Sequence, residues 1–391
     1  MNRAEHDRPA VAVIGGGNGA FAVAADLGAR GYRVRLLEDG AYSRGLDAIR
    51  AAGGIKIADP DPLHHAVSFA PIEAATYDPE EALDTAAIVL VVVPAYAEKR
   101  FGVLILPYLR SDQLVLFTSG TFGSALEFRE IAIASGRKPP LVGESESLIV
   151  GGFKVDSSTV RLAGIKNGVH VAVLPGDMAD QALQSLHRIY DDIELIDSTF
   201  QVGLGNLNMV LHPPVMVLNA GRIGVDANFG VYRGGFTREV AAVVAALDAE
   251  RLMVASAMGL SMPSSLQRLA EWYPLIPDLS DLYNAVTTNP AYERVSVPAT
   301  LDHRFLTEDV PFGLVPLEAI AALHGVVTPV ATALIELTNH LLGRDVRAQG
   351  RTLAQLGLQR PRKDAGGSVA VDGNEGVPNS AVVRRRRDKN A

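Results

Sequence analysis

Short apolar runs alternate with helical patterns through the first half of the chain. Between the first two runs, residues 20–30 have apolar positions at the spacing of a helix that ends near Gly31. Strands that alternate with helices in this way predict a parallel sheet with helices on both faces, which is an α/β fold of the Rossmann type. The runs that we expect to form its buried strands are residues 11–14, 34–37, 88–93, 114–117 and 193–196.

A two-residue turn signal lies further along this half. Asn167-Gly168 stands between the apolar runs 160–163 and 169–174, which is the pattern of a β-hairpin. We therefore assign Lys166 to the turn of this hairpin and not to catalysis.

The pattern changes from Phe200 onward. Strand signals nearly vanish, and long stretches rich in Ala, Leu, Val and Met follow, such as residues 238–258 and 314–342. The sequence therefore predicts a Rossmann-type domain over residues 1–199 and an all-α domain over residues 200–360. A site that holds a nucleotide and a substrate is expected in the cleft between the two domains.

Residues 361–391 have a different composition. They contain several glycines, the arginine run 384–387 and almost no large apolar side chain. Such a segment cannot bury enough apolar surface to offset the entropy lost on ordering, so we predict a disordered basic tail. The arginine run is expected to be solvated, and contact with a phosphate or a membrane surface is the alternative.

Composition and charge exclude several classes of protein. With 48% hydrophobic residues the chain can bury a core, and its net charge of -8 argues against a general nucleic-acid-binding surface. The absence of cysteine excludes disulfide scaffolds, thiolate metal sites and cysteine nucleophiles. No apolar run has the length of a membrane span, and the polar residues 1–10 do not resemble a secretory signal. We therefore expect a cytoplasmic protein.

The turn after the first strand carries the clearest chemical signal. Gly15, Gly17 and Ala20 fit the pattern G-x-G-x-x-A between a strand and a helix. There the first glycine permits a tight turn, the second lets the backbone approach a pyrophosphate, and the third position allows close helix–strand packing. Because the N–H groups at a helix start bind phosphates, we expect this loop, with Asn18 and Gly19, to bind a dinucleotide. A glycine-rich turn without a ligand is the alternative.

Glu38 follows the second strand, about twenty residues after the glycines, at the usual distance for a ribose ligand. A carboxylate there accepts hydrogen bonds from the adenosine ribose and repels a 2′-phosphate, which favours NAD over NADP. Asp39 strengthens this preference, and Arg44 weakens it. The alternative for Glu38 is a solvated strand end.

Several further patterns occur in order along the chain. They are G-G-G-N-G-A at 15–20, V-P-A-Y-A at 93–97, N-L-N-M-V-L-H-P-P at 206–214 and R-F-L-T-E-D-V-P at 304–311. Together they resemble the octopine/nopaline (opine) dehydrogenase family. The resemblance implies a Rossmann-type domain followed by a helical domain like that of 6-phosphogluconate dehydrogenase. It also implies an NAD(P)H-dependent oxidoreductase acting on CH–NH bonds, which reversibly condenses an amino acid with a 2-oxo acid such as pyruvate to an N-(1-carboxyalkyl)amino acid.

His212 is the leading candidate for catalysis. It follows two asparagines and precedes two prolines, which predicts a position at a helix start or kink beside the junction of the domains. Imidazole is the natural proton donor near neutral pH, although position alone allows a structural role equally well. The resemblance favours catalysis and pairs His212 with Asp309, whose carboxylate would fix the imidazole tautomer and favour its protonated form. A helix N-cap is the alternative for Asp309.

Other residues of these segments are expected to bind ligands. Arg304 offers a planar fork that matches a carboxylate, so we expect it to hold the 2-oxo acid, with a surface ion pair as the alternative. Asn208 is expected to orient the nicotinamide carboxamide or the substrate, and Glu144 to bind the amino group or a cationic side chain of the amino acid. Pro94 is expected at the cofactor site. No cluster of histidines and carboxylates has metal-ligand spacing, so no metal is expected.

Two other functions are compatible with the same pattern. One is a 2-oxo or 2-hydroxy acid reductase of the same two-domain build, which would need no amine. The other is a sensor that binds NAD without turnover, a hypothesis that His212, Asp309 and Arg304 disfavour. The expected partners are small molecules, without nucleic acid or membrane, and a homodimer is left open.

Overall fold

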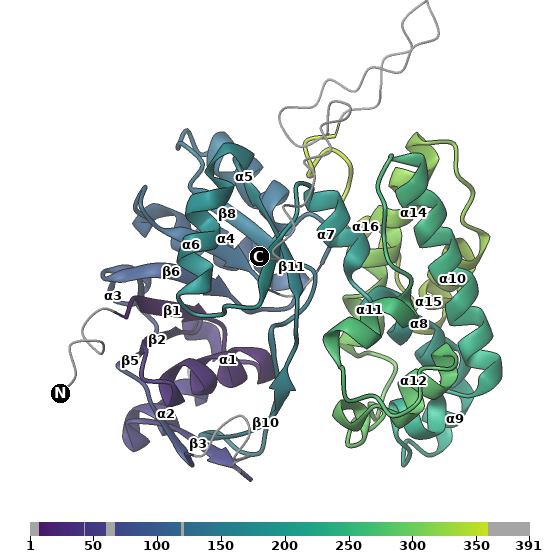
Figure 1. Cartoon of the computed structure of the whole chain (residues 1–391), viewed down its shortest axis with the longest axis horizontal. Helices are drawn as coiled ribbons and strands as arrows, with labels where there is room; N and C mark the ends of the chain where they lie inside the picture. The colour runs from purple at the N-terminus through teal and green to yellow at the C-terminus, as the bar shows by residue number, and fades with distance from the viewer. Residues whose placement is uncertain (1–7, 43, 60–66, 119–120, 359–391) are drawn as a thin grey trace, which may run out of the picture.

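The molecule has two halves that lie side by side, an α/β half and a helical half (Figure 1). The computed structural model describes residues 8–42, 44–59, 67–118 and 121–358. The predicted fold class, an α/β region followed by helices, is confirmed. The basic tail predicted at 361–391 lies outside the described residues.

The apolar runs of the first half collect in one sheet, where both faces are covered and the strands are buried. Its described pairs are parallel except that of β8 (Leu141–Ser145) with β11 (Val169–Leu174), so the predicted parallel sheet is confirmed apart from this pair. Within the described residues the sheet has eight strands, in the spatial order β12 (Ile193–Leu195), β11 (Val169–Leu174), β8 (Leu141–Ser145), β7 (Leu114–Phe117), β6 (Ala86–Val91), β1 (Ala10–Ile14), β2 (Arg33–Leu37) and β5 (Ala74–Thr76).

Helices cover both faces of this sheet, because successive strand residues point to opposite sides. Val11 and Val13 of β1 point into the apolar core on one face of the sheet, whereas Ala12 and Ile14 point into the core on the other face. The helices of this half are α1 (Asn18–Ala29), α2 (Arg44–Ala52), α3 (Pro79–Leu83), α4 (Ala95–Ile105), α5 (Ser124–Ala134) and α6 (Ala179–His187).

A second sheet packs against α1. Within the described residues its order is β4 (Phe69–Pro71), β3 (Gly54–Ala58), β10 (Thr159–Ile165) and β9 (Val150–Lys154). The predicted hairpin across Asn167-Gly168 is wrong, because β10 pairs with β9 and β3, whereas β11 joins the main sheet between β8 and β12. The physical reason is burial, since the apolar side chains of β11 are buried in the main core while β10 is half-exposed.

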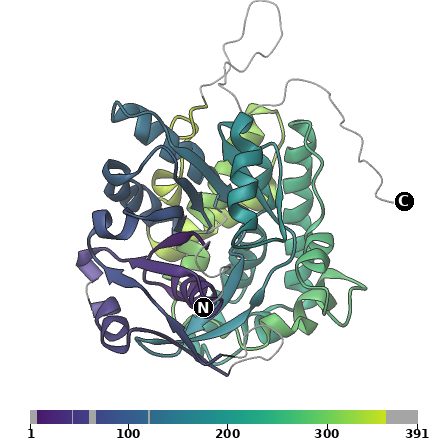
Figure 2. The same cartoon turned by 60° about the vertical axis from the view of Figure 1, so that its left-hand side comes forward.

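The second half of the chain is helical (Figures 1 and 2). The stretch 314–342 forms two helices and not one, because Gly325 is left-handed with a φ of 70° and Pro329 begins the second. None of the described helices has both the length and the apolar composition that a bilayer span requires. The helices are α7 (Thr199–Gly205), α8 (Asn208–Leu218), α9 (Ala220–Val225), α10 (Arg238–Ala257), α11 (Ser265–Trp272), α12 (Leu282–Thr288), α13 (Arg304–Thr307), α14 (Val315–Leu323), α15 (Pro329–Leu342) and α16 (Val346–Gln349), with π-helical turns at Val231–Gly235 and Val310–Leu314.

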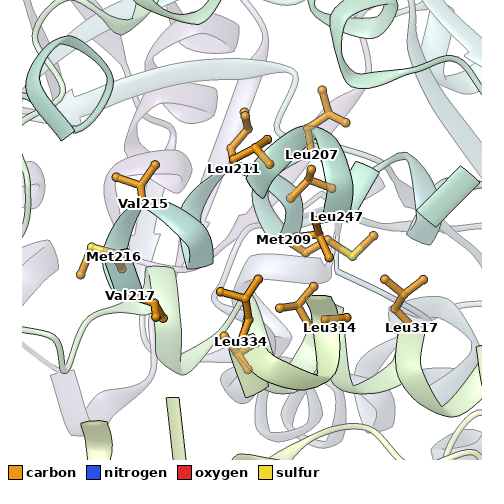
Figure 3. Packing of buried hydrophobic residues seen from close by; sticks show 14 of the residues in the cluster. Leu207, Met209, Leu211, Val215, Met216, Val217, Leu247, Leu314, Leu317 and Leu334 are labelled. Atoms are coloured by element: carbon orange, nitrogen blue, oxygen red, sulfur yellow. The ribbon is translucent and has the colours of Figure 1, made fainter. Parts of the chain in front are cut away.

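The core of the helical half forms around α8, which packs against α10, α13 and α15. Leu211, Val215 and Met216 of α8 lie in one apolar cluster with Leu314 and Leu334 (Figure 3). A polar side chain on α8 is therefore held in apolar surroundings, where it needs a hydrogen-bond partner.

Buried ion pairs join the two halves. Arg351, which follows α16, donates to Glu98 of α4 and to Glu127 of α5. Arg268 of α11 donates to Glu146, which follows β8. All of these side chains are buried. The pairs fix the helical half against the α/β half and so fix the site between them.

Candidate active site

Helix α8 places His212 in the interior of the helical half. The helix begins at Asn208, so His212 lies in its second turn, and Pro213 and Pro214 follow within the helix. Each proline lacks an amide hydrogen, so the helix loses internal hydrogen bonds beside the imidazole. His212 is 7% exposed and therefore nearly withdrawn from water.

The imidazole of His212 is held on three sides. Its Nδ1 lies 2.7 Å from Oδ2 of Asp309, and its Nε2 lies 2.7 Å from Oη of Tyr232. The ring of Phe305 stacks on it with centroids 3.8 Å apart. Because a carboxylate can only accept, Nδ1 carries the proton that is donated to Asp309, and Nε2 of the neutral ring accepts from the Tyr232 hydroxyl.

Asp309 directly precedes the π-helical turn Val310–Leu314, and it is 2% exposed. Asp309 occupies the N-cap position of this turn, as the alternative predicted, but its side chain makes no capping hydrogen bond. The carboxylate binds His212 instead, 97 residues away along the chain. The pair therefore has the geometry of an acid–base group with an orienting carboxylate.

Arg304 begins α13 at the boundary between the halves. Its Nε donates to Oε2 of Glu308 at 2.9 Å, and 38% of its side chain is exposed. Arg304 thus forms an ion pair, which was the alternative to its role in substrate binding. This pair uses Nε and leaves the Nη atoms without a hydrogen bond to any described residue. Arg304 can therefore hold a carboxylate and an ion-pair partner at the same time.

Glu308 connects this arginine to the α/β half. It is fully buried, and its Oε1 accepts a 3.0 Å hydrogen bond from the backbone N of Ala95, the first residue of α4. Burial raises the pKa of Glu308 to about 7, although the positive charge of Arg304 opposes the rise. The carboxyl group is therefore poised to change charge near neutral pH.

Among the cavities lined by described residues, two share Arg304. One, of about 570 Å³, reaches Phe305 in the helical half and Asn18 in the glycine-rich loop. The other, of about 710 Å³, reaches Tyr96 near the start of α4. Arg304 therefore borders space that lies between the two halves and that small polar ligands can enter.

The glycine-rich loop fits a pyrophosphate. Gly15 has a φ of 127°, and a Cβ there would lie 2.4 Å from the carbonyl oxygen of Val92, so the turn requires glycine. A Cβ on Gly17 would meet nothing within 4 Å, which leaves open space beside the backbone. No side chain caps the N-terminus of α1, so its first amide groups remain available to a ligand. Gly19 and the buried Ala20 form its first turn.

Glu38 and Lys154 lie together beside this loop. Glu38 is 8% exposed, so the alternative of a solvated strand end is excluded, and a Cβ on Gly16 would lie 1.4 Å from its Oε2. Lys154, at the end of β9, donates from Nζ to the carbonyl oxygen of Gly16 at 3.1 Å, and its backbone N donates to Oδ1 of Asn18. Burial raises the pKa of Glu38 and lowers that of Lys154. The side chain of Arg44 lies outside the described part of the chain.

Asn208 and Pro94 occupy the starts of two helices. Asn208 is the first residue of α8, one turn before His212, and it is half-buried. Residues four apart on a helix lie on the same face, so the two side chains are neighbours. Pro94 is the N-cap of α4, beyond the end of β6. Both positions are compatible with contact to a ligand between the halves.

Glu144 has a different environment. It is 1% exposed on β8, and its Oε2 accepts a 2.8 Å hydrogen bond from the backbone N of Ala125 at the start of α5. Burial raises its pKa to about 8. The carboxyl group thus contacts α5 and not His212, and its role in binding the amino acid stays a prediction.

Two residues of this site received no role from the sequence. Tyr232 lies in the π-helical turn Val231–Gly235, which has no periodic apolar pattern. Glu308 lies beside the predicted Asp309, and only its place in the family-like segment 304–311 could have indicated a role for it. Their importance follows from contacts with distant parts of the chain.

The chain is similar to proteins of one family over most of its length. A sequence model described as NAD/NADP octopine/nopaline dehydrogenase, alpha-helical domain, matches residues 195–342. An opine dehydrogenase of Arthrobacter sp. (strain 1C) is 32% identical over 357 residues, which cover 89% of this chain and 94% of that protein.

Two solved dehydrogenase structures have the same fold. An octopine dehydrogenase solved with NADH and L-arginine has a TM-score of 0.70 at 23% identity, over 89% of this chain and 96% of that one. A yersinopine dehydrogenase solved with NADP+ has a TM-score of 0.66 at 17% identity, over 89% and 97%. At these identities the likeness shows the shared architecture of an α/β half followed by a helical half.

Proposed function

The chain belongs to the octopine/nopaline (opine) dehydrogenase family, and from this premise we propose that it is an opine-type dehydrogenase. It condenses an amino acid with a 2-oxo acid such as pyruvate, with NAD(P)H as reductant, and forms an N-(1-carboxyalkyl)amino acid reversibly. The observation that carries this proposal is the buried Asp309–His212 pair, which lies close in sequence and space to the partly exposed Arg304. The pair supplies a proton, and the guanidinium supplies an anchor for a carboxylate.

Substrate binding begins at Arg304. Its Nη atoms offer a fork to the carboxylate of the 2-oxo acid, while Nε keeps its bond to Glu308. The oxo group is then held on the side of the His212–Asp309 pair, which is the source of the acid proton, and Asn208 supports the substrate from one helical turn away. The amine of the second substrate attacks the carbonyl carbon.

The acid is needed twice in this reaction. His212 provides a proton as the carbonyl oxygen gains charge during attack, recovers a proton from the nitrogen that has become positively charged, and provides it again as the carbinolamine loses water. Asp309 keeps the imidazole in the required tautomer and stabilises its protonated form. The cofactor, when bound at Gly15, Gly17 and Glu38, supplies the hydride that reduces the imine.

An NADH-oxidation assay tests the proposed reaction. The protein is incubated with NADH and a panel of 2-oxo acids, first alone and then with single amino acids. We expect oxidation that depends on both substrates. Oxidation with the 2-oxo acid alone would indicate a simple 2-oxo acid reductase, and dinucleotide binding without any turnover would indicate a sensor. Cytoplasmic location and assembly as a homodimer remain predictions from the sequence.

Glu38 is expected to make NADH the preferred reductant. Its buried carboxylate beside the glycine-rich loop can bind the ribose hydroxyls and repels a 2′-phosphate. The ratio of kcat/KM for NADH to that for NADPH should be on the order of 10 to 100, equivalent to about 1.4–2.8 kcal/mol. Glu38→Ser should reduce this ratio. A preference for NADPH that is lost in Lys154→Ala would contradict the prediction and assign the phosphate to Lys154.

Binding of the 2-oxo acid is expected to weaken as pH rises through about 7, the pKa to which burial raises Glu308. Below this pH Glu308 is neutral and the guanidinium of Arg304 keeps its full attraction for the substrate carboxylate, whereas above it the negative charge of Glu308 beside Nε offsets part of that attraction. The apparent KM for the 2-oxo acid should rise about fivefold, the equivalent of about 1 kcal/mol for a partly exposed ion pair.

Glu308→Gln provides the comparison for this pH dependence. At saturating NADH and amino acid, the KM of this variant for the 2-oxo acid should stay at its low-pH value across the range. The same rise in wild type and variant would show that Glu308 does not control Arg304.

A further inference from the structure

Both nitrogens of the His212 imidazole already have hydrogen-bond partners. Nδ1 is bound to Asp309, Nε2 lies 2.7 Å from the Tyr232 hydroxyl, and Phe305 covers one face of the ring. A substrate oxygen therefore cannot meet a free nitrogen of this imidazole in the observed geometry. The proton that His212 provides must leave through one of its two partners, or one partner must first move away.

Tyr232 is held firmly in place. Its ring stacks on Tyr292 with centroids 4.3 Å apart, and Tyr292 in turn makes an edge contact with Tyr273. The turn that carries it is anchored by a 2.9 Å hydrogen bond from the backbone N of Val231 to the carbonyl oxygen of Val295. Moving the hydroxyl away from His212 would require this aromatic stack to separate.

The hydroxyl of Tyr232 has capacity for one more hydrogen bond. Among the described residues His212 is its only hydrogen-bond partner, whereas a phenol can donate one bond and accept another. Burial raises its pKa well above the usual value, so the group stays protonated at neutral pH. Arg304 is connected to this hydroxyl through its neighbour in α13, because Phe305 stacks on the His212 imidazole that Tyr232 contacts.

We propose that Tyr232 is a further catalytic residue, through whose hydroxyl His212 exchanges its proton with the substrate. The proposal rests on the proposed function. As the amine nitrogen forms its bond to the carbonyl carbon, the π electrons of the carbonyl move to its oxygen. When His212 is protonated, its Nε2–H donates to the Tyr232 oxygen and the hydroxyl hydrogen is free to donate to the substrate. The carbonyl oxygen takes the hydroxyl proton of Tyr232, and Tyr232 takes the Nε2 proton of the imidazolium. Tyr232 is a neutral phenol before and after the transfer, and His212 is left neutral.

Tyr232→Phe tests this role with little change in packing. The variant keeps the stacked ring and removes only the hydroxyl, so kcat should fall about 10²-fold, within the range for a positioned proton donor. The Kd for NADH and the thermal melting midpoint should stay close to those of wild type. The matched control is Tyr292→Phe, which removes a hydroxyl from the neighbouring ring of the same stack and should keep kcat close to wild type.

A proton inventory separates a relay from a positioning role. Rates are measured in mixtures of light and heavy water, under conditions where deuterated NADH shows no primary isotope effect, so that the proton-transfer step and not hydride transfer limits the rate. A relay moves two protons together, so the wild-type inventory should curve downward below the straight line that one proton gives. A linear wild-type inventory, or a kcat of Tyr232→Phe equal to that of wild type or above it, would overturn the relay.

The two proposals can fail separately. If wild type oxidises no NADH with any pair of amino acid and 2-oxo acid, the proposed function fails. If wild type turns over and Tyr232→Phe does so equally well, the reaction stands and the role of Tyr232 is refuted.

Discussion

His212→Ala is expected to lower kcat by about 10²–10⁴-fold, the contribution of a positioned acid or base. The affinity for NADH should stay near that of wild type, because the glycine-rich loop lies in the α/β half and His212 lies on α8. Steady-state kinetics together with NADH titration by fluorescence measure both quantities. The substitution removes a buried imidazole and its hydrogen bonds to Asp309 and Tyr232, which could destabilise the protein. Thermal melting therefore checks that the variant is folded.

The matched control for this variant is His187→Ala. His187 lies on α6, where its Nε2 is bonded to the carbonyl oxygen of Ile193, away from the site between the halves. Its replacement should leave kcat close to wild type. Normal turnover by His212→Ala would remove the mechanism proposed here.

Asp309→Asn completes the test of the pair. The asparagine amide is neutral, so it no longer stabilises the imidazolium. Its NH2 group can also donate to Nδ1, which favours the wrong tautomer of the imidazole. The rate should fall, and the losses from His212→Ala and Asp309→Asn should not add in the double variant if the two residues act as one unit. Additive losses would show that Asp309 acts independently of His212.

Arg351→Met is expected to cause the largest loss of stability, about 3–5 kcal/mol, the cost of removing one partner from a buried ion pair. Arg351 is 1% exposed and binds Glu98 and Glu127, and it also donates to Thr121 and to the carbonyl oxygen of Phe122. Without it the buried Glu98 and Glu127 lose the guanidinium that both of them bind. The loss should appear in the free energy of unfolding measured with urea.

Arg347→Met is the matched control for this stability test. Arg347 pairs with Glu318 and Glu336, but one third of its side chain is exposed. An exposed pair contributes little, so this variant should lose about 1 kcal/mol or less. Equal losses in the two variants would show that the buried contacts between the halves do not control stability.

Local patterns explain which parts of the fold could be predicted. The strand–turn–helix at Gly15 and Gly17 is a short-range signal, because the turn geometry and the helix start are both encoded in neighbouring residues. The strands β1, β6 and β7 are continuous apolar runs, and β2 is apolar except at Arg33 and Arg35, so neighbouring residues also identify these strands. The structure contains them close to the predicted positions.

The main error in the predicted fold, the hairpin across Asn167-Gly168, arose because pairing between distant strands is not encoded in the turn. Asn167-Gly168 has the composition of a hairpin turn, but the choice of partner for β11 depends on β8 and β12, which the turn residues do not specify. The strand β8 was not predicted, because its sequence L-V-G-E-S has no apolar periodicity. The carboxylate of Glu144 in this strand is stabilised by a hydrogen bond from the start of α5, which is distant in sequence.

In the site, too, residues in recognisable local segments could be predicted, whereas residues defined by contacts between distant segments could not. His212 and Asp309 could be found because each lies in a segment that resembles the family. Glu308 and Tyr232 could not be given roles, because Glu308 binds Ala95 from 213 residues away and Tyr232 meets His212 from an irregular turn. Such contacts arise only when the two halves and the aromatic stack are assembled.

The most direct test of the account is the identity of the product. Wild type is incubated with NADH, a 2-oxo acid and an amino acid that is isotopically labelled at its nitrogen, and the products are identified by mass spectrometry. The account predicts a secondary amine that retains the labelled nitrogen and joins the carbon skeletons of both substrates. A 2-hydroxy acid without the label, formed equally well in the absence of the amino acid, would contradict it.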